Sequence, residues 1–238
     1  MTLAAQLDGL AGFTYGPFAN TPTFPFGVAC WLLPTNPLRA DHNFIWSFNV
    51  SSRTDLRGVF AGGIQNTTGN MMVHAGDLAS TTVRTVTGVT PPADTWVWCD
   101  WWFPDGMTCI FDANFAFALP KTVTYPDMNP VSPIGFNRFC IGKRATANAA
   151  TNYYEGHIAQ LWLHDRELTV PEKDSLRLGR HPEEVCPGTV IAMFDSMGAT
   201  IGRPMLDNYQ LFTLTTISAT GITSSALRPP DVSHPANL

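Results

Sequence analysis

The chain contains 238 residues with a net charge of −5, and only 14% of its residues are charged. A typical soluble domain carries about 25% charged residues. The low fraction therefore indicates either a β-protein rich in turns or a surface partly buried against other subunits. The acidic balance argues against nucleic-acid binding, which depends on clustered lysines and arginines. No apolar run approaches the roughly 20 residues that span a bilayer, so we expect no membrane insertion.

Short apolar runs separated by turn-forming residues predict at least ten β-strands along the chain. We expect these strands within residues 26–33, 43–52, 56–64, 71–76, 80–89, 96–103, 107–115, 121–125, 137–142, 157–165, 189–195 and 210–219. The N-terminus has neither a basic start nor a continuous apolar segment, so no signal peptide is expected.

The segment WVWCDWWFPDGMTCIFDAN, residues 96–114, holds four tryptophans within seven positions. It could be an aromatic platform for a sugar or a base, or the centre of a β-structure. Trp96, Trp98, Asp100 and Trp102 share one face of an extended strand, and Val, Cys, Trp and Phe share the other. Because both faces are mostly apolar and Pro-Asp-Gly forms turns, we predict a core hairpin. Exposure of Trp98 and Trp102 on a groove would favour a lectin, and burial of the tryptophans a scaffold; the outcome is given with the proposed function.

One segment predicts a helix, near residues 170–178. Thr169 and Glu172 have the spacing of a capping box, in which each side chain satisfies a free backbone amide of the other. Pro171 falls in the first turn, where a missing N–H costs little, and Gly179 can end the helix.

The five cysteines form no C-x-x-C pair, and four of them lie in apolar, strand-like runs. Such cysteines are usually small buried hydrophobic residues. We predict free thiols at Cys30, Cys99, Cys109, Cys140 and Cys186.

The order of these elements resembles the concanavalin A-like jelly rolls of the laminin-G-like group. The residues that carry the resemblance are GVACWLLP at 27–34, Thr95-Trp96, CIFDAN at 109–114, Ile141-Gly142 and, above all, YYEGHIAQLWLHDRELTVPEKDSLRLG at 153–179. The resemblance implies an all-β fold, a two-sheet antiparallel sandwich with one short capped helix.

The closing segment, residues 186–232, resembles the end of jelly-roll proteins encoded by tailed phages. On this basis we predict one sandwich over residues 1–227 and an extended proline-rich arm over 228–238. The resemblance also implies a virion protein that is made in the host cytoplasm.

Some proteins of this fold are glycoside hydrolases, which need two carboxylates about 5–9.5 Å apart. None of the five glutamates begins the E-x-D-x-x-E or E-x-D-x-E pattern of the retaining enzymes. Motifs for serine hydrolases, zinc proteases and P-loop enzymes are also absent from the sequence. We therefore expect no enzymatic activity.

The resemblance suggests calcium as a possible cofactor, held by loop oxygens. Asp8 and Asp207 are the candidate ligands, although both could instead be turn aspartates that accept local backbone bonds. Tyr153 and Tyr154 are candidates for a glycan-binding surface patch, with one of the two expected in the core.

The leading hypothesis is a non-enzymatic phage virion protein, most simply a decoration or cement protein on the capsid surface. Its partners would be other virion proteins of the capsid lattice or tail, and further copies of itself in a homo-oligomer. The alternative is a lectin-like tail-fibre or receptor-binding module that binds host-surface glycans. A glycoside hydrolase is the third hypothesis.

Overall fold

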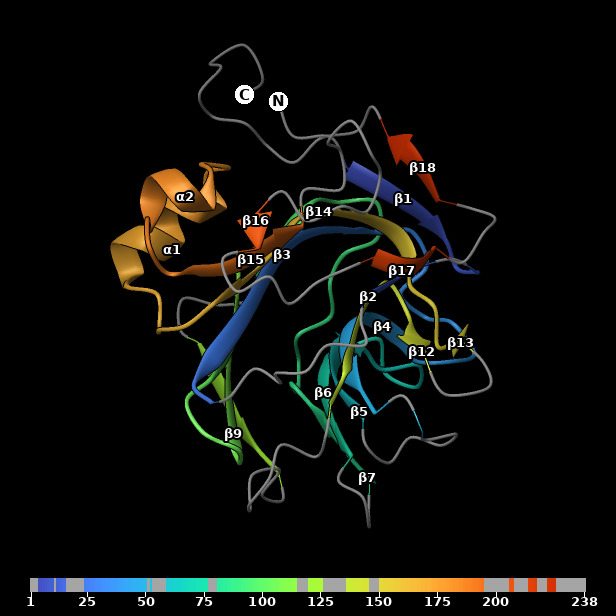
Figure 1. Cartoon of the computed structure of the whole chain (residues 1–238). Helices are drawn as coiled ribbons and strands as arrows, with labels where there is room; N and C mark the ends of the chain where they lie inside the picture. Colours follow the sequence, from blue (N-terminus) through green and yellow to red (C-terminus); the bar gives the residue numbers. More distant parts are fainter. Residues whose placement is uncertain are drawn as a thin grey trace.

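The computed structural model describes residues 4–10, 12–15, 24–50, 52, 59–76, 81–114, 120–125, 136–145, 150–194, 206–207, 214–217 and 222–225. These residues form two large antiparallel sheets that face each other, and two short helices (Figure 1). The predicted all-β sandwich is confirmed. None of the described helices is long and apolar enough to cross a membrane.

The larger sheet, sheet A, has nine strands. In spatial order they are β10 (Lys121–Thr124), β9 (Thr108–Ala113), β8 (Val97–Phe103), β3 (Phe26–Pro34), β14 (Glu155–His164), β1 (Ala4–Asp8) and β18 (Ile222–Ser225), with β15 (Val190–Phe194) on β14 and β16 (Leu206–Asp207) on β15. Strands β1 and β15 share one edge of β14, β1 along its first half and β15 along its second.

Sheet B has seven strands. Their order is β17 (Leu214–Ile217), β2 (Phe13–Tyr15), β11 (Arg138–Ile141), β4 (Asn43–Asn49), β5 (Val59–Ile64), β6 (Met71–Gly76) and β7 (Thr81–Thr85). A small separate ladder pairs β12 (Arg144–Ala145) with β13 (Ala150–Thr151). The predicted boundary at residue 227 and the arm at 228–238 lie outside the described residues.

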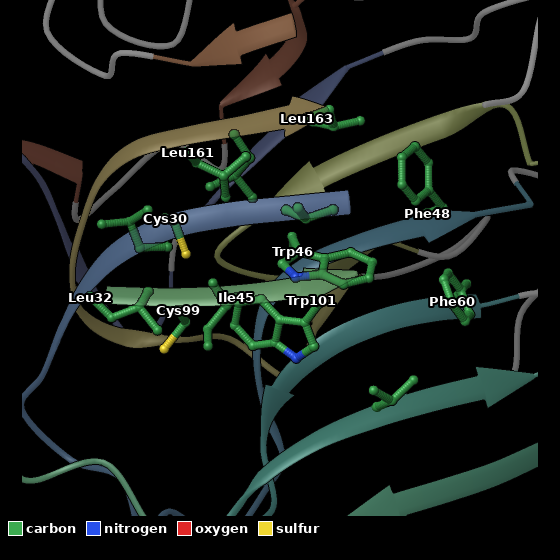
Figure 2. Packing of buried hydrophobic residues seen from close by; sticks show 14 of the residues in the cluster. Cys30, Leu32, Ile45, Trp46, Phe48, Phe60, Cys99, Trp101, Leu161 and Leu163 are labelled. Carbon is green, nitrogen blue, oxygen red and sulfur yellow. The ribbon is translucent and has the colours of Figure 1, made fainter. Parts of the chain in front are cut away.

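The inner faces of the two sheets form an aromatic core. Trp101 of sheet A meets Trp46 of sheet B edge to face, with ring centroids 6.0 Å apart (Figure 2). Cys30 lies directly opposite Cys99 in the same core. All five cysteines are buried free thiols, as predicted, and burial raises the pKa of Cys30 and Cys99 well above the ordinary value.

The outer face of sheet A carries a second apolar cluster beneath α1 (Val170–Arg177) and α2 (Pro182–Val185), which lie together against the sheet (Figure 1). Trp31, Trp98 and Trp162 are buried there. Side chains alternate along β8, so Trp98 packs under the helices while Trp101 enters the inner core. The core hairpin is therefore confirmed, and its two apolar faces follow from burial on both sides.

Helix α1 begins where the capping box predicts it. The Thr169 backbone N–H donates to Glu172 Oε2 at 2.8 Å, and Arg166 donates to both carboxylate oxygens of Glu172, at 2.9 and 2.6 Å. These bonds, that from Arg166 first, lower the pKa of Glu172 to about 2. The one-turn helix α2 is not predicted from the sequence.

Glu172→Gln should lower the free energy of unfolding by up to about 1 kcal/mol at neutral pH, because it removes the charge that pairs with Arg166 while glutamine can still accept from the Thr169 N–H. A carboxylate with a depressed pKa stabilises the fold above its ordinary pKa, 4.5 here, and the contribution is lost as pH falls towards 2. Urea unfolding of both proteins between pH 7 and 2.5 measures the difference. A difference that does not shrink below pH 4.5 would contradict this assignment.

Candidate functional site

The strand register separates the two predicted calcium ligands. Asp8 on β1 pairs with Glu155 at the start of β14, whereas Asp207 on β16 pairs with Ala192. Ala192 in turn pairs with Leu163 near the end of β14, which places the two aspartates roughly 25 Å apart along the sheet at about 3.3 Å per residue. Asp8 is exposed, and its Oδ1 accepts the Leu10 backbone N–H at 2.9 Å, a local turn contact.

The predicted tyrosine patch is also divided. Tyr154 is fully buried in the inner core and cannot form part of a glycan-binding surface, because no ligand could reach its ring. Tyr153 is half-buried and forms an isolated bridge to Phe44 of sheet B. Among the described residues, no group of three or more His, Cys, Asp or Glu side chains is placed to hold a metal ion.

A buried group of charges joins α1 to the outer face of sheet A. Asp100 on β8 lies directly opposite Asp112 on β9, an arrangement that is unfavourable for two like charges. The Lys173 ammonium of α1 lies 3.7 Å from Asp100 Oδ2 and 3.4 Å from Asp112 Oδ2, and Arg177 also pairs with Asp112. Lys173 and Arg177 of α1 thus balance the negative charges of both carboxylates.

His164 completes this group from β14. Its Nε2 lies 3.0 Å from Asp100 Oδ1, and its Nδ1 donates to the Arg166 carbonyl oxygen at 2.7 Å. The Trp102 ring stacks on the imidazole at 5.6 Å, and the Trp162 ring lies 5.0 Å away. His164 and Asp100 are fully buried, so this group of side chains has a structural role. We call the group, which consists of Asp100, Asp112, His164, Lys173 and Arg177, the clamp.

Gly27 on β3 leaves the space that this histidine occupies. A Cβ added at Gly27 would lie 2.0 Å from His164 Cε1, far inside contact distance.

Gly27→Ala should therefore displace the imidazole and lower the free energy of unfolding by about 1–3 kcal/mol. In a His164→Ala background, the same substitution should cost much less, as chemical denaturation of the four proteins would show. An equal cost in both backgrounds would mean that the ring does not limit this position.

The outer face of sheet A also carries a row of side chains that we call the outer strip: Trp96, which packs against the cluster beneath the helices, and Leu33, His157 and Gln6. Leu33 pairs with His157, and His157 pairs with Gln6, so these side chains point to the same face. Trp96 precedes β8 and meets His157 edge to face, with centroids 6.2 Å apart. Strands position Leu33, His157 and Gln6, and Trp96 directly precedes β8.

Trp96 differs from the other tryptophans of the chain. All seven lie in the described part of the structure, and six are buried, whereas Trp96 is half-buried. Beside it, His157 is 4% exposed, and its Nδ1 has no hydrogen-bond partner among the described residues. Burial lowers the pKa of His157, with Asp94 acting in the opposite direction, so the imidazole is neutral at neutral pH.

Carboxylates and amides adjoin the outer strip at its open end. Glu155 pairs with Asp8 across the strands, and Glu155 Oε2 lies 3.5 Å from Arg39 Nη1 and 3.3 Å from Asn36 Nδ2. Asp94 is exposed, and its backbone N–H donates to the Pro34 carbonyl oxygen, at the end of β3, at 2.8 Å. The site thus combines an accessible aromatic ring with hydrogen-bonding groups on both sides.

Comparison with solved structures identifies the architecture. A heptameric SAP-like pentraxin from Limulus polyphemus is 12% identical, with a TM-score of 0.54 over 94% of both chains. The CBM40 of the Ruminococcus gnavus IT-sialidase, bound to alpha2,3 sialyllactose, is 12% identical, with a TM-score of 0.52 over 74% of this chain and 98% of that module. A leech intramolecular trans-sialidase is 14% identical, with a TM-score of 0.51, and the match covers 72% of this chain and 27% of that enzyme.

The chain has the concanavalin A-like jelly-roll fold. At these identities the likeness concerns the fold alone, and it confirms the architecture that the sequence resemblance implies. No family model matches the sequence, and no curated protein matches it.

Within this jelly roll, the sequence analysis assigns Trp96 to the core together with its neighbours. Alternation along β8 correctly predicts which face Trp96 shares with Trp98. This alternation does not show how exposed Trp96 is, because its exposure depends on how α1 and α2 pack on the sheet. His157 carries no sequence signal as a site residue, since only the strand register brings it beside Trp96.

Proposed function

We propose that this protein is a non-catalytic glycan-binding module and that its site is the outer strip. The observation that carries the proposal is the half-buried Trp96 ring with the carboxylates of Asp94 and Glu155 beside it. An aromatic ring offers an apolar face to the C–H surface of a sugar, while amide and carboxylate groups pair with its hydroxyls. The match to a CBM40 bound to a sialylated sugar supports this class of ligand.

Binding without catalysis agrees with the state of the carboxylates. Asp100 and Asp112 are buried and ion-paired to α1. A glycosidase needs two carboxylates on either side of a bound glycosidic bond, one of them free to donate a proton. Glu155, at the open end of the outer strip, is held by Arg39 and Asn36.

Trp96→Ala should abolish binding on a glycan array and in titration calorimetry with the best array ligand. The variant should still fold, because Trp96 is half-buried, whereas Trp98→Ala should cost about 3–5 kcal/mol through the cavity it leaves. Leu178→Ala, an exposed position directly after α1, serves as the control and should bind normally. Undiminished binding by a folded Trp96→Ala variant would refute the location of the site.

A virion-surface structural role is the second candidate. Trp98 and Trp102 are buried, which by the criterion set from the sequence favours this role over a lectin built on those two rings. Leu10 and Leu38 are 65% and 64% exposed, and only 14% of the residues in the chain are charged, as expected where another subunit docks. The resemblance of the closing segment to tailed-phage proteins favours the same role. A decoration protein could combine many such weak contacts on a symmetric particle.

Co-sedimentation with undecorated capsids tests this second role. Saturable binding at a fixed copy ratio is expected, weakened by Leu10→Ser with Leu38→Ser and lost when residues 228–238 are removed. Absence of binding by the intact protein would count against a capsid role and leave glycan binding as the proposal to pursue.

A further inference from the structure

We propose that the outer strip selects neutral glycans and discriminates against glycans that carry carboxylate or sulfate groups. This inference rests on the proposed glycan-binding function and specifies the class of its ligand.

The first argument is the charge around the strip. Asp8, Asp94 and Glu155 adjoin it, and Asp8 and Asp94 are exposed. Among the described residues, Arg39 is the cation that contacts this group, through Glu155 at 3.5 Å. Three carboxylates against one guanidinium leave a net charge of −2 beside the aromatic ring. At such short range this repels an anionic ligand even where solvent screens the field.

The second argument is that the cations near the strip are already engaged. Arg39 is about three-quarters buried and points to Glu155, so pairing with a ligand carboxylate would leave Glu155 without its cation. Arg177 lies over the Trp98 ring at 5.4 Å, but Asp112 and Asp174 both pair with it. His157 supplies no positive charge at neutral pH, because burial lowers its pKa.

The third argument concerns hydrogen bonding. Ionised carboxylates only accept hydrogen bonds. A sugar hydroxyl both donates and accepts, so it can donate to Asp8 or Glu155. A ligand carboxylate or sulfate carries only hydrogen-bond acceptors, so it cannot pair with the accepting carboxylates of the site. The site therefore differs in expected ligand from the CBM40 that was solved with sialyllactose.

The test is an array of neutral oligosaccharides printed beside their sialylated and sulfated counterparts, followed by calorimetry on the best-bound pair in low and high salt. We expect the neutral member to bind roughly tenfold more tightly than its anionic counterpart at low salt, with the preference shrinking as salt is raised. The double variant Asp8→Asn with Glu155→Gln removes two negative charges but keeps a hydrogen-bond-accepting oxygen at each position. It should bind both members of the pair nearly equally.

A matched control removes the same charge at the opposite end of β14, through Asp165→Asn with Glu167→Gln, both exposed. This control should keep the wild-type preference. Equal or tighter binding of the anionic member by the wild type would overturn the inference while leaving glycan binding intact. A preference unchanged in the Asp8/Glu155 variant would also overturn it, since the named carboxylates would not be its source. Binding to no glycan at all would overturn both the proposed function and this inference.

Discussion

The architecture depends on one constraint: the central strands of sheet A must bury both of their faces. Strands β8, β3 and β14 are apolar on the inner face and, over much of their length, on the outer face as well. Sheet B covers the inner face. Helices α1 and α2 cover the part of the outer face that includes Trp31, Trp98 and Trp162. In the outer strip, Trp96 packs against this same cluster and is half-buried.

Buried charges determine where the helical cover sits. The two facing carboxylates of Asp100 and Asp112 would be unfavourable beneath a purely apolar helix. Lys173 of α1 therefore has to contact both of them. Removing one partner of such a buried group leaves an uncompensated charge, which is far costlier than losing a surface pair. The group therefore disfavours helix positions in which Lys173 cannot reach both carboxylates. In this way the packing of α1 also fixes how much of sheet A remains open.

Local patterns in the sequence were sufficient for much of the fold. Alternation along residues 96–103 predicts the two faces of β8, and the Thr169–Glu172 spacing predicts the start of α1. The clamp and the outer strip could not be predicted in this way, because their members come from strands and helices far apart in the chain. Tyr154 shows the same limit, since two adjacent tyrosines look equivalent until the register buries one of them.

The half-buried state of Trp96 makes the central claim directly measurable. In a spectrum of the 15N-labelled protein, the seven tryptophan side chains give seven indole N–H signals, and Trp96→Phe assigns one of them. Titration with a neutral oligosaccharide that binds on the array should shift the Trp96 signal and leave the six buried indoles nearly unchanged. Saturable binding that leaves the Trp96 signal in place would contradict the account, because the ligand would then occupy another surface of the jelly roll.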